Sequence, residues 1–154
     1  MQVIFTLLNE TKVDDAQASQ PAVKVQDHLY WACIKAAQCY RNQQRVFIFC
    51  DNQQVAHQID ELLWSFSTDS FVPHNLPGEG LNSGSPVEIS WQAPTNQRHI
   101  LINLASELPS FASQFSQIID FVPSDEALKK LARIRYRGYQ QLGFKVTTSP
   151  AQAA

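Results

Sequence analysis

Short apolar runs alternate with longer segments of helical periodicity along most of the chain. The runs are rich in β-branched and aromatic residues, and they occupy residues 2–8, 45–50, 87–91, 99–104 and 118–122. Because nearly every position in them is apolar, both faces of each strand must be covered, which is typical of a parallel sheet between two layers of helices. The pattern predicts a three-layer α/β domain with a mostly parallel sheet of about five strands.

Helical patterns occupy the stretches between these strands. They cover residues 25–42, residues 53–66, a short stretch holding Phe111 and Phe115, and a last helix that starts at Pro123 and Ser124 and ends at Gly143. Asp51 precedes the second helix and is expected to be its N-cap. Residues 9–22 and 75–86 are expected to be loops.

Length and composition predict one domain over residues 1–146 and a flexible C-terminal tail over residues 147–154. A chain of 154 residues with 44% hydrophobic content can bury one ordinary core. The apolar runs are too short for a membrane span, and the N-terminus lacks the basic start of a signal peptide. The three cysteines, Cys33, Cys39 and Cys50, show no CxxC spacing. We expect reduced, buried thiols in a cytoplasmic protein that uses no zinc.

Motifs for catalysis and nucleotide binding are absent from the sequence. No GxGxxG turn and no GxxxxGK[ST] loop is present, and Asp51 resembles a ribose-binding acid only by its position after a strand. The four histidines fall in different segments, without the spacing of a metal pair. The expectation is therefore no catalytic residue, no cofactor, no small-molecule ligand and no metal.

Positive charge is concentrated in one helix. Of twelve Lys and Arg residues, five fall within "KKLARIRYR", residues 129–137, although the net charge is -2 and the pI about 6.0. Four of these cations share one arc of the helix, which Tyr136 borders: Lys129, Lys130, Arg133 and Arg137. The opposite, apolar side is expected to hold Ala127, Leu128, Leu131, Ala132, Ile134, Tyr139 and Leu142.

The cationic arc admits two interpretations. It can be a solvated face that balances the helix dipole, or a site for a carboxylate attached to an apolar side chain, with phosphate as the rival ligand. Arg135 projects into the apolar side, where it must either extend to solvent or pair with a buried acid.

A second unusual segment is "SFVPHNLPGEG", residues 70–80. It places Phe71, Val72 and Pro73 beside a run of Asn, Pro and Gly residues that favours a turn. These apolar side chains either pack on the protein's own core or await a partner, and the residues alone leave both alternatives open.

Several segments together resemble the chi subunits of bacterial DNA polymerase III holoenzymes. They are "ELLWSF", "DSFVPHNLPGEG", "SPVEISW", "ILINL" and "IIDFVPSDEALKKLARIRYRGYQQLGF". The resemblance runs from the first strand to Phe144. It implies a Rossmann-like fold and a non-catalytic protein that bridges two partners in the cytoplasm, at the replication fork.

The resemblance also implies where those partners bind. The psi subunit of the clamp-loader complex would bind Trp64, Phe71, Val72 and Pro73. The acidic C-terminal tail of single-stranded-DNA-binding protein would bind Val122, Lys129, Arg133, Tyr136 and Arg137. Arg133 would hold the terminal carboxylate of the tail, and Val122 and Tyr136 would flank its aromatic residue.

Two other classes of function remain as alternatives. A nucleotide-dependent α/β enzyme is disfavoured because the phosphate loop is missing. A direct single-stranded nucleic-acid binder is disfavoured by the pI of about 6.0 and by the few aromatic residues beside the cations. The expected partners are proteins, with no direct contact to nucleic acid and none to a membrane.

Overall fold

The computed structural model of the chain describes residues 2–8, 27–65, 74–76, 86–94, 98–123 and 125–150. Strands and helices alternate along these residues, as the pattern predicts. The strands are β1 (Gln2–Leu7), β2 (Val46–Phe49), β3 (His74–Asn75), β4 (Val87–Ser90), β5 (Ile100–Asn103), β6 (Gln117–Val122) and β7 (Lys145–Pro150). The helices are α2 (Asp27–Arg41), α3 (Gln53–Ser65), the 3-10 turn η1 (Ala112–Gln114) and α4 (Glu126–Gln141).

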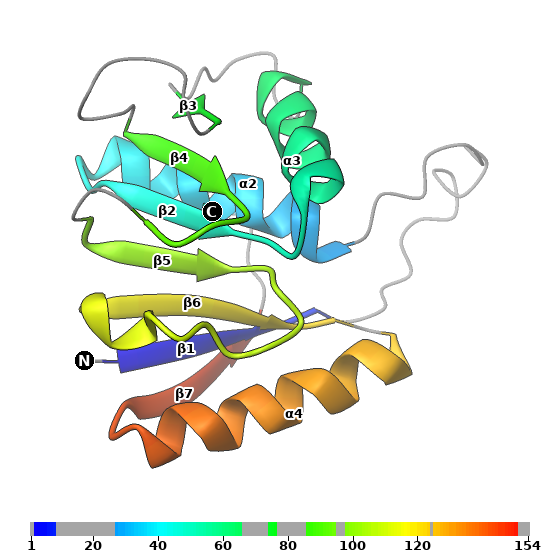
Figure 1. The fold of residues 1–154 in the computed structure, drawn as a ribbon, viewed down its shortest axis with the longest axis vertical. Helices are drawn as coiled ribbons and strands as arrows, with labels where there is room; N and C mark the ends of the chain where they lie inside the picture. The colour runs from blue at the N-terminus through cyan, green and yellow to red at the C-terminus, as the bar shows by residue number, and fades with distance from the viewer. Residues whose placement is uncertain are drawn as a thin grey trace.

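The strands form one seven-stranded sheet in the order β3-β4-β2-β5-β6-β1-β7 (Figure 1). Every pair of neighbouring strands in it is parallel. The predicted Rossmann-like α/β class is confirmed. The estimate of about five strands was too low, because two edge strands carry no apolar run.

Those edge strands correct two predictions. β3 has two residues, and the second of them, Asn75, lies in the range 75–86 that was expected to be a loop. β7 has the mostly exposed sequence KVTTSP, so the prediction of a flexible tail from residue 147 is wrong for residues 147–150. An edge strand has one uncovered side and does not need to be apolar, which removes the signal used to find it.

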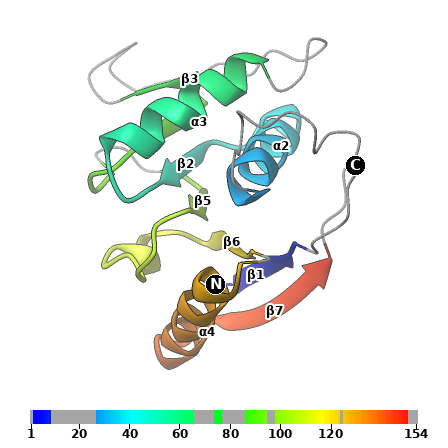
Figure 2. The same ribbon diagram turned by 90° about the vertical axis from the view of Figure 1, so that its right-hand side faces the viewer.

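Alternating side chains build a separate core on each face of the sheet. Val46 and Ile48 join the cluster under α2 and α3, whereas Phe47 joins the cluster under α4 and η1. In Figure 2, α2 and α4 lie on opposite sides of the strands. The three-layer arrangement follows from strands that are apolar on both faces.

Two of the predicted helix starts are wrong in detail. Asn52, not Asp51, caps α3, since its Oδ1 accepts a hydrogen bond of 3.0 Å from the amide of Val55. The carboxylate of Asp51 instead accepts bonds from the amide and the hydroxyl of Ser106. At α4 the cap is Asp125, which accepts 3.0 Å from the amide of Leu128, so Pro123 and Ser124 precede the helix.

Other local features agree with the sequence. The short helix expected around Phe111 and Phe115 is the turn η1, and both rings are buried. Gly143 follows α4 with φ +94°, a conformation that favours glycine. None of the described helices is long and apolar enough to cross a membrane.

Candidate protein-interaction site

Helix α4 packs one face on the sheet through Ala132, Arg135 and Tyr139, all of which are buried. Arg135 settles one question left by the sequence, because its guanidinium does not extend to solvent. Its Nη2 and Nε donate to the two carboxylate oxygens of Asp120 on β6, at 2.9 and 3.0 Å. The cation in the apolar face is therefore paired with a buried acid.

Asp120 is the centre of a larger polar network. Its carboxylate also accepts hydrogen bonds from the hydroxyl of Tyr139 at 2.9 Å and from Nδ2 of Asn103 at 3.2 Å. Burial and the neighbouring Asp120 charge raise the pKa of Tyr139 well above its ordinary value. Because Arg135 and Tyr139 are one turn apart, the network ties α4 to β6 and fixes which side of the helix faces outward.

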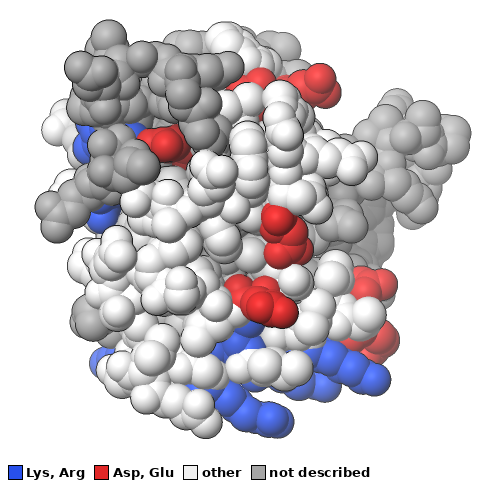
Figure 3. All heavy atoms as spheres, in the orientation of Figure 1, with Lys and Arg blue, Asp and Glu red and all other residues white. Residues whose placement is uncertain are grey.

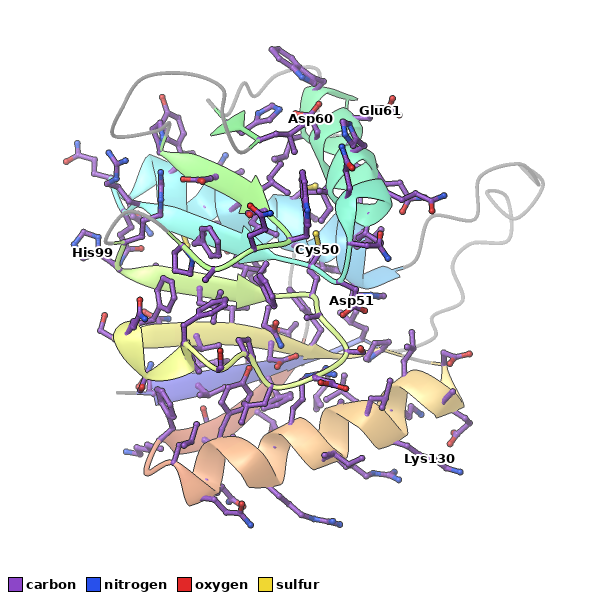
Figure 4. The ribbon with its side chains drawn as sticks, viewed as in Figure 1. Cys50, Asp51, Asp60, Glu61, His99 and Lys130 are labelled. Atoms are coloured by element: carbon purple, nitrogen blue, oxygen red, sulfur yellow. The ribbon has the colours of Figure 1, made fainter. Side chains whose placement is uncertain are left out.

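The outward side of α4 carries the cations. Lys130, Arg133 and Arg137 are exposed, and Figure 3 shows Lys and Arg gathered over the part of the molecule where α4 lies. Figure 4 shows Lys130 pointing away from the sheet. Lys129 is half-buried, and its Nζ lies 3.6 Å from the carboxylate of Glu126, an exposed pair of small energetic value.

Tyr136 lies on the flank of α4 that faces β1. Its ring centroid is 5.2 Å from that of Phe5, and both Tyr136 and Val122 pack half-buried against the core beneath α4. Lys129 and Arg133 fall on the same helix row as Tyr136, at spacings of seven and three. The structure therefore brings cations and an apolar surface together on this flank.

The other flank of α4 faces Leu108. A side chain at Gly138 would put its Cβ 3.1 Å from Cδ2 of Leu108, so the helix lies close to that residue. Ile134 and Leu142 were expected on the packed side, but they are 63% and 51% exposed. The packed face of α4 is therefore narrower than predicted, because it is centred on Ala132, Arg135 and Tyr139, while Ile134 and Leu142 lie outside it.

The second predicted surface is described only in part. Trp64, near the end of α3, is 61% exposed, and its ring centroid lies 5.0 Å from that of His74 on β3. His74 in turn places Nε2 3.1 Å from Oδ1 of Asp60. The remaining residues of this surface, Phe71, Val72 and Pro73, lie outside the described residues.

Open parallel sheets that bind a nucleotide hold it at the carboxyl ends of their strands. At that edge, Asp51 bonds to Ser106, and Cys50 is buried beside it (Figure 4). Burial raises the pKa of Cys50 and of Cys33 to about 12, which keeps both thiols protonated and unreactive at neutral pH. Within the described ranges, no group of three or more His, Cys, Asp or Glu residues could hold a metal ion.

A second buried ion pair lies near the amino ends of the strands, where sequence reasoning did not expect one. Nη2 of Arg98 donates 3.1 Å to Oε1 of Glu88, and Nη1 donates 3.0 Å to the carbonyl of Pro86. Burial lowers the pKa of Arg98, and the nearby Arg45 lowers it further. A hollow of about 390 Å³ beside this pair is lined by Tyr40, Arg41, Gln43, Gln44, Arg45 and Pro86.

Known proteins match this chain over nearly its whole length. The family described as "DNA polymerase III chi subunit, HolC" matches residues 1–147. The DNA polymerase III subunit chi of Escherichia coli K12 is 40% identical over 147 residues, which is 94% of this chain and 94% of the relative. The subunit chi of Haemophilus influenzae is 45% identical over 76% of this chain and 83% of the relative. The crystal structure of T4 UvsW shares the fold alone, with a TM-score of 0.57 and 10% identity over 98% of this chain and 41% of that one.

Proposed function

Since the chain belongs to the DNA polymerase III chi subunit family, we propose that it links two proteins of the replication machinery without catalysing a reaction. One partner is the psi subunit of the clamp-loader complex. The other is the acidic C-terminal tail of single-stranded-DNA-binding protein. The protein would act in the bacterial cytoplasm, at the replication fork.

The observation that carries this proposal is the row formed by Lys129, Arg133 and Tyr136 on one flank of α4. It offers a forked guanidinium beside an apolar surface, which matches a carboxylate attached to an aromatic residue. We assign Arg133 to the terminal carboxylate, and Lys129 and Arg137 to the acidic residues that precede it. Val122 and Tyr136 would contact the aromatic ring. Arg135 takes no part, because Asp120 binds it inside the protein.

Exposure of Trp64 supports the second binding site. Large apolar side chains are rarely this exposed on a helix, and Trp64 is 61% exposed. Tryptophan is also enriched among the residues that contribute most of the binding energy at protein interfaces. Psi would cover Trp64 together with Phe71, Val72 and Pro73. The proposal for these last three residues rests on their resemblance to the family pattern alone.

The positions of the two sites suit a bridging role. Trp64 belongs to α3, which packs at the β3–β4 end of the sheet, whereas α4 packs at the end formed by β6, β1 and β7. Figure 1 shows α3 and α4 at opposite ends of the molecule. Two partners bound there would not compete for the same surface.

A bridging experiment tests the proposal with purified proteins. Immobilised psi should capture this protein, and the captured protein should then bind a peptide that carries the acidic tail. Trp64→Ala should weaken the capture and leave peptide binding in solution intact, whereas Arg133→Ala should weaken peptide binding and leave the capture intact. If either variant impairs both interactions, with its fold intact, the two sites are not separate and the bridging proposal is wrong.

A further inference from the structure

Strand β7 leaves an uncovered surface beside the cationic flank of α4. Parallel register pairs Leu7 of β1 with Val122 of β6 on one side and with Pro150 of β7 on the other. Two residues earlier, Phe5 pairs with Thr148. Paired residues in a sheet share a face, so Val122, Leu7 and Thr148 lie on the face that α4 covers.

Helix α4 covers only part of this face. Phe5 is fully buried beneath Tyr136 and Tyr139, yet Thr148 beside it is exposed and Leu7 is 37% exposed. Figure 2 shows β7 extending past α4 at the outer edge of the sheet. We call the set of Leu7, Val122, Tyr136, Val146 and Thr148 the α4–β7 surface.

The charges around the α4–β7 surface are positive. Lys129 and Arg133 share the helix row of Tyr136, which faces β1, and the residues of β7 include no acid. Within the described residues, the acid closest along α4 to these cations is Glu126, which already pairs with Lys129. This surface therefore combines exposed apolar groups with cations and suits a segment that is both acidic and apolar.

We propose that the α4–β7 surface is the floor on which the acidic tail peptide lies, and that Leu7 and Thr148 are binding residues for it. The inference rests on the proposed function and extends the site from α4 onto the outer two strands of the sheet. The aromatic end of the peptide contacts Leu7 and Val122. Its terminal carboxylate binds Arg133, and the acidic residues before it run beside Lys129. Leu7 and Thr148 carry no sequence signal for this role, because only the strand register places them beside α4.

Neighbouring threonines on β7 provide a matched test. Thr148 lies on the α4 side of the strand, whereas Thr147 pairs with Ile4 and lies on the other face, and both are exposed. Thr148→Glu should weaken binding of an Asp-rich, Phe-terminated peptide at least tenfold at 0.15 M salt, because it places a carboxylate on the floor of the site. Thr147→Glu adds the same charge on the opposite face, and it should change the affinity less than threefold because salt screens charges over about 8 Å.

The outcomes separate this inference from the proposed function. If the wild-type protein fails to bind the peptide, the proposed function fails. If the wild-type protein binds the peptide and Arg133→Ala weakens that binding, but both threonine variants bind the peptide as well as the wild type does, the proposed function stands and the assignment of the α4–β7 surface is wrong.

Leu7→Ala serves as a second variant. It should weaken peptide binding at least fivefold while the circular dichroism spectrum of the protein stays unchanged. A dimer in sedimentation that dissociates with Thr148→Glu and not with the peptide would assign the surface to a second copy instead.

Discussion

The guanidinium of Arg135 holds the carboxylate of Asp120 through two parallel hydrogen bonds, Nη2 to Oδ1 at 2.9 Å and Nε to Oδ2 at 3.0 Å. Arg135 is 7% exposed and Asp120 is fully buried. This pairing explains why Arg135, one of the five cations in residues 129–137, belongs to the core. Its other consequence is that Arg133, two positions away, faces outward.

Removing the acid from this pair should destabilise the whole domain. Asp120→Asn leaves a buried guanidinium without its counter-charge, so we expect the free energy of unfolding to fall by about 3 to 5 kcal/mol. Urea denaturation measures the loss. Glu126→Gln is the matched control, because it removes the acid of the exposed pair with Lys129 and should cost under about 1 kcal/mol. Similar losses for the two variants would show that burial of the Asp120 pair has no energetic consequence.

The central strands and the long helices could be predicted because burial on both faces forces a near-continuous apolar pattern. β7 could not, since an edge strand that is exposed on one side has no need of such residues. The N-cap of α3 was misassigned for a related reason. Asp51 and Asn52 are both good caps, and the choice depends on Ser106, a contact 55 residues away in sequence.

Much of the cationic site could also be predicted, because helical spacing alone places Lys129, Arg133 and Tyr136 on one side. Spacing could not say which flank of α4 faces β1 and which faces Leu108. That depends on the register of β1 with β6 and β7, which no local pattern encodes. Leu7 and Thr148 were missed for this reason, and Ile134 was wrongly placed in the packed face.

Trp64 should matter for psi binding and little for folding. Its side chain is 61% exposed, so Trp64→Ala should change the free energy of unfolding by under about 1 kcal/mol. Psi affinity should fall by about 2 kcal/mol or more, as for an interface anchor. Isothermal titration calorimetry with psi checks this. Tyr30, which is 43% exposed on α2, is the control, and Tyr30→Ala should leave psi binding unchanged. Equal losses for both variants would contradict the assignment of Trp64.

Alkaline pH should destabilise the fold through its buried thiols. Burial raises the pKa of Cys33 and Cys50 to about 12 from an ordinary value of 9.0, so the folded state retains these protons longer than the unfolded state. Their contribution to stability is complete below about pH 9 and is lost as pH rises towards 12, by about 1.4 kcal/mol per pH unit for each thiol. Urea denaturation at about pH 8, below this range, and at about pH 10.5, within it, measures the slope. The double variant Cys33→Ala, Cys50→Ala should flatten it, and an unchanged slope would refute the explanation.

The guanidinium of Arg133 should contribute more to tail binding than its charge alone. Arg133→Ala should weaken binding of the acidic tail peptide by about 2 kcal/mol, roughly 30-fold. Arg133→Lys should recover only part of this loss, because an ammonium group lacks the two-donor fork. Lys130→Ala is the control, since Lys130 belongs to the same helix and points away from the sheet (Figure 4). If Lys130→Ala costs as much as Arg133→Ala, the helix attracts acidic peptides without a defined site.

A double-mutant cycle between Arg133 and the carboxylate of the peptide tests the central claim most directly. Fluorescence anisotropy gives the affinities of wild-type and Arg133→Ala proteins for the tail peptide with a free and with an amidated C-terminus. We predict that amidation costs the wild-type protein about as much as Arg133→Ala does, and that it costs the Arg133→Ala protein almost nothing further. If the two losses instead add in full, Arg133 does not bind the terminal carboxylate, and the assignment of this site is wrong.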